Sequence, residues 1–289
     1  NVNAINPARS GQANRRVTWN GSVPVIRVHM RTTAATGDIV RPAAAPSDTN
    51  APTMVFLHGF NTDGRAFVNM RSLASRYRLI AYDFPWEGRC YTGEVKDFVC
   101  LLDDFFQIMG LDTVSLLGYS FGGAIAVHYA GGGGKSVVRD LTLLSTTIFG
   151  ATPEDRGKNQ RMADKLLPYP DYKLYYLIDK ARAVAELMDS RSVAERVESD
   201  ILVMKKVGWY RQVLGSLRDY DGAPFARRIT CPVLAIYGTT DRVIAPAASQ
   251  IIPRFIPHAQ MIVLEGKGHS AAYLDGELVA AKVLARARL

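Results

Sequence analysis

The sequence predicts an α/β fold, a mainly parallel sheet flanked by helices, with one helical insertion. Short continuous apolar runs alternate with helical stretches over residues 54–147 and again over 228–289. Between these segments, residues 148–227 show helical spacing, many charges and no obvious strand. Continuous apolar runs are typical of strands that are buried on both faces of a parallel sheet. We therefore expect a core domain of residues 15–147 and 228–289, a helical cap of residues 148–227, and a flexible N-terminal arm of residues 1–14.

The first elements predict a hairpin and a long loop. Two strands over residues 17–19 and 23–31 are joined at Asn20-Gly21, a dipeptide that favours a tight hairpin turn. Residues 33–52 are rich in Ala, Pro, Thr, Ser and Asp, which indicates a surface loop of unusual length.

The core elements follow in order along the chain. The apolar runs predict strands at residues 54–57, 79–82, 114–117, 141–144, 233–237 and 261–264. Helical patterns lie at residues 66–77, 95–109 and 122–129 and from residue 271 onward.

Composition limits the partners that we expect. The chain of 289 residues carries a net charge of +8, but its basic residues are scattered, so we expect no nucleic-acid partner. No apolar stretch is long enough to predict a membrane span. The three cysteines lack metal-ligand spacing, so we expect no metal site, and we expect no cofactor either. They are interpreted as free thiols, which favour a cytoplasmic location. No signal peptide is visible, but the first residue is Asn1 instead of Met, so removal of a signal peptide by processing stays an open alternative. Assembly into a homo-oligomer is a further open alternative.

The most informative motif is Gly118-Tyr-Ser120-Phe-Gly122-Gly123, directly after the run at residues 114–117. A serine hydroxyl becomes a nucleophile when a sharp turn exposes it and a neighbouring base accepts its proton. Such a turn between strand and helix needs small residues two positions before and after the serine. The same turn directs the amide of Phe121, at the start of the helix, toward a developing oxyanion. The motif predicts Ser120 as a catalytic nucleophile.

Two further candidates follow later strands. Asp241 ends Gly238-Thr-Thr-Asp, and His269 ends Gly266-Lys-Gly-His. Loops that follow parallel strands meet at one edge of the sheet, where open α/β sheets place their sites. We expect His269 to take the proton of Ser120, and Asp241 to fix the tautomer of His269 and to stabilise its imidazolium form. A backbone amide from the loop His58-Gly-Phe60, that of Phe60, would complete an oxyanion hole with Phe121. His58 itself is interpreted as a turn former.

With these motifs in place, the chain resembles the α/β-hydrolase superfamily, in its lid-bearing, single-domain branch. The segments HGF, GYSFGG, GTTD and GKGH match the family in type and order from about residue 17 to the C-terminus, and the match weakens in the insertion. The resemblance implies a catalytic triad of Ser120, Asp241 and His269, with oxyanion donors at Phe60 and Phe121. A serine nucleophile argues against the dehalogenase and epoxide hydrolase branches, which use aspartate.

Departures from the family pattern leave the substrate open. Trp86 and Cys90 stand where relatives usually carry Gly and Ser, and Ser270 follows the histidine where many carbon–carbon hydrolases carry Trp. We expect substrate contacts from Trp86 and Tyr119, and from Tyr176 and Trp209 of the cap, around an apolar, small-molecule ester. Carbon–carbon hydrolysis, lactone opening, perhydrolysis and lyase chemistry remain alternatives on the same triad, as does a binding protein without turnover.

Overall fold

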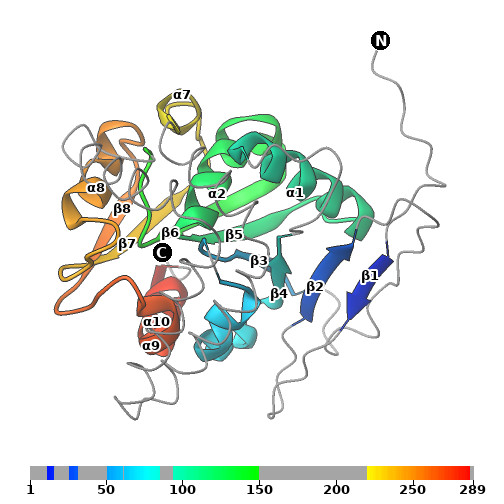
Figure 1. The fold of residues 1–289 in the computed structure, drawn as a ribbon, viewed down its shortest axis with the longest axis horizontal. Coiled ribbons are helices and arrows are strands. Elements are labelled where there is room, and N and C mark those ends of the chain that lie inside the picture. Colours follow the sequence, from blue (N-terminus) through cyan, green and yellow to red (C-terminus); the bar gives the residue numbers. More distant parts are fainter. Residues whose placement is uncertain are drawn as a thin grey trace, which may run out of the picture.

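The computed structural model describes residues 51–60, 62–84, 94–149 and 220–286, together with the course of strands β1 (Gln12–Arg15) and β2 (Ile26–Arg31). Its centre is a sheet of eight described strands in the order β1-β2-β4-β3-β5-β6-β7-β8 (Figure 1). Among these eight described strands, only β1 and β2 pair antiparallel. The predicted mainly parallel α/β fold is confirmed. The remaining strands are β3 (Thr53–Leu57), β4 (Arg78–Asp83), β5 (Val114–Tyr119), β6 (Val138–Leu144), β7 (Val233–Gly238) and β8 (Gln260–Leu264).

Helices cover both faces of this sheet (Figure 1). One face packs against α1 (Val95–Met109) and α2 (Phe121–Gly131), and the other packs against η1 (Gly64–Ser75), α9 (Ala271–Leu274) and α10 (Gly276–Arg286). The shorter helical elements are η2 (Gly133–Ser136), α7 (Ala223–Ala226), α8 (Pro246–Gln250) and η3 (Ile252–Arg254).

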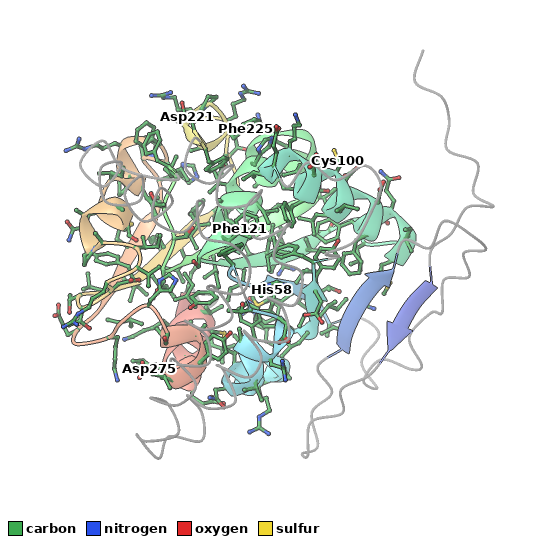
Figure 2. All side chains as sticks on the ribbon, viewed as in Figure 1. His58, Cys100, Phe121, Asp221, Phe225 and Asp275 are labelled. Carbon is green, nitrogen blue, oxygen red and sulfur yellow. The ribbon has the colours of Figure 1, made fainter. Side chains whose placement is uncertain are left out.

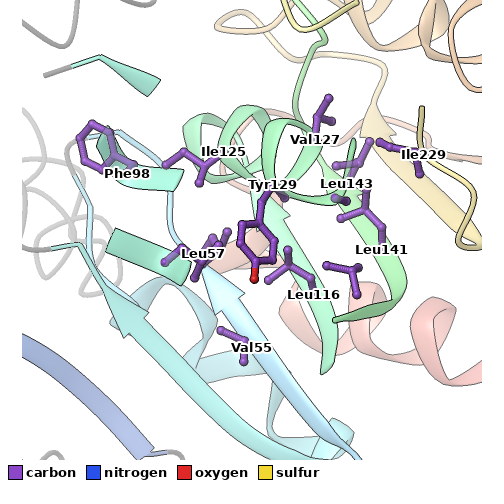
Figure 3. Packing of buried hydrophobic residues seen from close by; sticks show 14 of the residues in the cluster. Val55, Leu57, Phe98, Leu116, Ile125, Val127, Tyr129, Leu141, Leu143 and Ile229 are labelled. Atoms are coloured by element: carbon purple, nitrogen blue, oxygen red, sulfur yellow. The ribbon is translucent and has the colours of Figure 1, made fainter. Parts of the chain in front are cut away.

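Each central strand contributes to two hydrophobic clusters. Val55 and Leu57 of β3 point into the cluster beneath α1 and α2 (Figure 3), whereas Met54 and Phe56 point into the cluster beneath η1, α9 and α10. Successive side chains of a strand face opposite sides of the sheet, so a strand that is covered on both sides needs apolar residues at every position. This requirement explains the continuous apolar runs in the sequence.

Two expected elements differ from the structure. The helical stretch expected at residues 66–77 is the 3₁₀ helix η1, which starts at Gly64, is kinked at Met70, and has Gly64, Phe67, Met70 and Leu73 among its buried residues. Their spacing of three matches the three residues per turn of a 3₁₀ helix. The first strand is β1, which begins inside the expected arm of residues 1–14 and ends one residue beyond it, whereas the strand expected at 17–19 and its turn lie outside the described residues. Three of the four residues of β1, QANR, are polar, and the strand lies on the edge of the sheet, so no apolar pattern marks it.

Most of the expected cap, residues 150–219, lies outside the described residues. The two points where the core connects to this segment lie together. Phe149 and Asp221 form an antiparallel bridge, and the Gly222 amide donates to the Ile148 carbonyl at 2.9 Å. The chain leaves the core after β6 and returns before β7, and these two strands are neighbours in the sheet.

The sheet also brings the predicted site loops to one edge. Leu57, the last residue of β3, pairs with Gly118 of β5, and Gly238 of β7 pairs with Leu264 of β8. Because β3, β5, β6, β7 and β8 are parallel, the loops that follow them all emerge at their carboxyl ends.

Candidate active site

Ser120 occupies a sharp turn between β5 and α2. Its backbone has φ 52° and ψ −116°, a left-handed conformation that L-residues rarely adopt. Surrounding hydrogen bonds hold this conformation. The Ser120 amide donates to the Leu144 carbonyl at 2.9 Å, and the Ser120 carbonyl accepts from the Thr146 hydroxyl at 2.6 Å. The turn is therefore fixed from the neighbouring strand β6 and its following loop.

Glycines make this turn possible by close approach. A Cβ atom on Gly118 would lie 2.5 Å from the Gly122 carbonyl oxygen, and one on Gly122 would lie 2.2 Å from the Leu57 carbonyl oxygen. Both contacts are with backbone atoms, which cannot rotate away. The two glycines of the motif thus allow α2 to begin directly against the end of β3.

His269 connects the hydroxyl of Ser120 to the carboxylate of Asp241. The distance from His269 Nε2 to Ser120 Oγ is 3.0 Å, and the distance from His269 Nδ1 to Asp241 Oδ2 is 2.9 Å. Both are hydrogen-bond distances. The structure therefore brings together three side chains that lie 121 and 28 residues apart along the chain, at the edge where the sequence placed them.

Asp241 is held rigidly beneath the histidine. Its side chain is 1% exposed, and its Oδ1 atom accepts the amides of Val243 and Ile244, each at 2.9 Å. These bonds leave Oδ2 to face His269. A carboxylate in this position accepts a hydrogen bond from Nδ1–H, which keeps the proton on Nδ1 and leaves Nε2 unprotonated toward Ser120.

The amide of Phe121 and the loop that carries Phe60 lie beside Ser120. Phe121 is the first residue of α2, and the first amides of a helix have no intrahelical acceptor. The loop after β3 passes close to the serine, since a Cβ on Gly59 would lie 3.3 Å from Ser120 Cβ. The rings of Phe60 and Phe121 pack edge to face with centroids 6.2 Å apart.

His58 anchors the loop that carries Phe60, and the sequence-based interpretation of His58 as a simple turn former is incomplete. The side chain is completely buried, and its Nε2 accepts the Phe84 amide at 3.1 Å. The Nδ1 atom then carries the proton and donates to the Gly59 carbonyl at 2.8 Å. His58 thus ties the loop after β3 to the loop after β4, and Figure 2 shows it near the centre of the molecule.

The structure corrects the expectation that Tyr119 contacts substrate. Its side chain is only 1% exposed, and its hydroxyl donates to the His269 carbonyl at 3.0 Å. A buried phenol with this bond has no surface to offer a ligand. The other expected substrate contacts, Trp86, Tyr176 and Trp209, lie outside the described residues.

Comparison with known proteins identifies the family. Residues 54–282 match the alpha/beta hydrolase family. The chain belongs to this family. Lipase 3 of a Moraxella species is 26% identical over 249 residues, which cover 82% of this chain and 77% of that one. An esterase structure from Exiguobacterium antarcticum superposes with a TM-score of 0.67 at 18% identity, covering 83% and 92% of the two chains. At this identity the superposition supports the fold.

A third relative is matched over a shorter length. A probable 1-acylglycerol-3-phosphate O-acyltransferase of Oryza sativa subsp. japonica is 31% identical over 133 residues, which is 42% of this chain. The match spans about a third of that relative's length, 32%.

Two residues of this alpha/beta hydrolase support the site through hydrogen bonds that the sequence did not predict. Thr146 follows β6 at the site edge and bonds the carbonyl of Ser120, and Tyr119 bonds that of His269. The expected strand at residues 141–144 could have placed Thr146 at this edge, but no spacing or residue type indicated its partner. Among the described residues, no group of His, Cys, Asp and Glu side chains could hold a metal ion, and no helix could span a membrane.

Proposed function

We propose that this alpha/beta hydrolase cleaves a small to medium, largely apolar carboxylic ester through an acyl-enzyme on Ser120. The observation that carries the proposal is the continuous hydrogen-bonded series from Ser120 Oγ through the His269 imidazole to Asp241. A serine hydroxyl with a base at 3.0 Å and a carboxylate behind that base has the geometry required for nucleophilic acyl transfer.

The reaction follows from this geometry. Ser120 Oγ attacks the ester carbonyl carbon while His269 Nε2 takes the hydroxyl proton, and Asp241 stabilises the resulting imidazolium. The negative charge on the carbonyl oxygen is held by the amides of Phe60 and Phe121, the second of which lies at the N-terminus of α2. The alkoxide leaves with the proton from His269. A water molecule, activated by the same imidazole, then releases the acid and restores Ser120.

The position of the insertion supports a cap over this site. The core connects to residues 150–219 through Phe149 and Asp221, which follow β6 and precede β7. The site edge is formed by the carboxyl ends of the same parallel strands. A helical cap of residues 148–227 that starts from this edge would cover Ser120, and its aromatic residues Tyr176 and Trp209 would favour an apolar acyl group.

The test is the Ser120→Ala variant, with Ser75→Ala as its matched control because Ser75 is exposed at the end of η1. We expect Ser120→Ala to lose turnover of short-chain p-nitrophenyl esters and labelling by a fluorophosphonate probe, and Ser75→Ala to keep both. Undiminished ester hydrolysis by Ser120→Ala would overturn the proposal. A panel that includes lactones and carbon–carbon substrates separates the alternative reactions, and tight binding without turnover would indicate a binding protein.

A further inference from the structure

Tyr119 directly precedes the proposed nucleophile, and neighbouring aromatic side chains hold its ring in place. It is the last residue of β5, and its ring is completely enclosed on the side of the sheet that faces η1 and α9. Phe67 of η1 and Tyr273 of α9 pack edge to face against it, with centroid distances of 6.4 and 6.3 Å. These contacts give the phenol ring a single orientation.

The hydroxyl of that ring bonds the backbone of the proposed base. Tyr119 Oη donates to the carbonyl oxygen of His269 at 3.0 Å, and the two rings lie 5.3 Å apart at an interplanar angle of 36°. Tyr119 is covalently joined to Ser120. The bond therefore fixes the backbone of residue 269 relative to the residue whose hydroxyl the imidazole must reach.

The loop that carries His269 has a particular need for such a restraint. It joins β8, which ends at Leu264, to α9, which begins at Ala271. Its first half is tied to the loop after β7, because the Lys267 carbonyl accepts the Thr240 amide at 3.0 Å. The hydroxyl of Tyr119 ties the second half to the end of β5. Without that hydroxyl, residue 269 would lose its bond to the strand that carries the nucleophile.

The same ring also limits the loop that carries Phe60. A Cβ atom on Gly59 would lie 3.0 Å from Tyr119 Cε1, so this loop passes directly over the phenol. The Tyr119 side chain thus contacts both the loop after β3 and the loop after β8, and Tyr119 itself is joined to Ser120 in the chain.

We propose that Tyr119 is a positioning residue that sets the distance and direction between the His269 imidazole and Ser120 Oγ. The inference rests on the acyl-enzyme function proposed above and assigns a role that acts through the proton-transfer step. Tyr119 touches no reacting atom. Its hydroxyl keeps Nε2 at hydrogen-bond distance from Oγ, and it does so through the carbonyl of residue 269. Proton transfer is sensitive to this distance, and a misplacement of about 1 Å can lower a rate by about 10²-fold.

Tyr119→Phe tests this role with little disturbance, since the ring and its packing remain and only the hydroxyl is lost. Tyr129→Phe is the matched control. Tyr129 is also 1% exposed, and its hydroxyl also makes a 3.0 Å bond, to Asp103 Oδ1. It projects from α2 into the opposite hydrophobic cluster, among Leu57 and Leu116 (Figure 3). Both variants remove one buried tyrosine hydroxyl, but only one of these hydroxyls bonds the backbone of residue 269.

The measurement is kcat per active site, with the sites counted by fluorophosphonate titration, together with KM and the unfolding midpoint in urea. We expect Tyr119→Phe to lower kcat per site roughly three- to thirtyfold, with KM within about twofold, because the lost restraint affects chemistry more than binding. The Tyr129→Phe variant should lose stability while its kcat per site stays within about twofold of the parent enzyme.

A second measurement asks whether the effect passes through the imidazole. In a His269→Ala background the hydroxyl has no base to position, so adding Tyr119→Phe should leave the residual rate unchanged within about twofold. An equal drop in both backgrounds overturns the proposal. So does a Tyr119→Phe enzyme that keeps its kcat per site, or one that loses only folded protein. Each of these results leaves the proposed function intact if Ser120→Ala is inactive, whereas an active Ser120→Ala enzyme refutes the function itself.

Discussion

Replacing Gly122 by alanine tests the contact that joins the proposed nucleophile to the oxyanion loop. Gly122 is the second residue of α2, two positions after Ser120. An added Cβ would lie 2.2 Å from the carbonyl oxygen of Leu57 and 2.7 Å from that of His58. Both oxygens belong to the backbone at the end of β3, the strand that leads into the loop carrying Phe60. The new methyl group can be accommodated only if the helix and that backbone move apart.

The size of the movement follows from the contact distance. Real Cβ atoms essentially never approach another heavy atom closer than 3.0 Å, so a contact of 2.2 Å requires a retreat of about 0.8 Å. Overpacking of this kind costs about 1–3 kcal/mol of unfolding free energy. We expect a cost near the upper limit of this range, because the added Cβ meets backbone atoms, which cannot rotate away as a side chain could. A shift of this size at reacting groups also lowers a rate by up to about 10²-fold.

The assay measures kcat/KM on a p-nitrophenyl ester and the free energy of unfolding in urea. Gly133→Ala is the matched control, since Gly133 begins η2 and a Cβ there would meet nothing within 4 Å. We expect this control to keep full activity and to gain about 0.4–1 kcal/mol of stability, because alanine restricts the unfolded chain. A Gly122→Ala enzyme that matches Gly133→Ala in both activity and stability would show that α2 is not in tight contact with β3.

Two further predictions concern the carboxylate of Asp241 at the site and the half-buried imidazole of His128. Asp241→Asn should lower kcat about 10⁴-fold, because a carboxamide no longer holds the required tautomer of His269, and a loss of less than tenfold at saturating ester would contradict that role. Burial, reinforced by the charge of Arg228, lowers the pKa of His128. The His128 ring stacks on the Phe225 ring, with the two ring centroids 3.6 Å apart. Below about pH 6.5 the unfolded chain binds a proton that the folded protein does not, so stability falls as the pH drops toward the lowered pKa, by up to about 1.4 kcal/mol per pH unit. His128→Phe keeps the stack and removes this titration, so urea unfolding should show a smaller loss between pH 7 and pH 5 than in the parent enzyme, and equal losses would exclude the assignment.

Patterns that depend on burial alone could be read from the sequence. The expected helix at residues 95–109 coincides with α1, which begins with a capping box between Glu94 and Asp97 and is capped after Met109 by Gly110 in a left-handed conformation. The apolar runs marked β3 to β8 to within three residues at each end. For the central strands the reason is that a strand covered on both faces must be apolar, whereas the edge strand β8 is only partly buried. The edge strand β1 has the sequence QANR, which contains no apolar run, and it therefore left no such mark.

The motif residues were predicted because local geometry limits their type. A turn as tight as that at Ser120 requires glycine at positions 118 and 122, and the parallel direction of β7 and β8 brings the loops of Asp241 and His269 to the same edge. The sequence thus determined the fold class and the edge of the sheet that carries the site.

Only the tertiary structure decided which side chains support that site. His58, Tyr119 and Thr146 each bond a backbone group of another loop, at separations of 26, 150 and 26 residues. A hydrogen bond to a backbone amide or carbonyl makes no demand on the side chain of its partner, so the partner's residue type holds no trace of it. Such contacts depend on how close two loops come once the sheet has formed, and this distance is set by packing and by no local pattern in the chain.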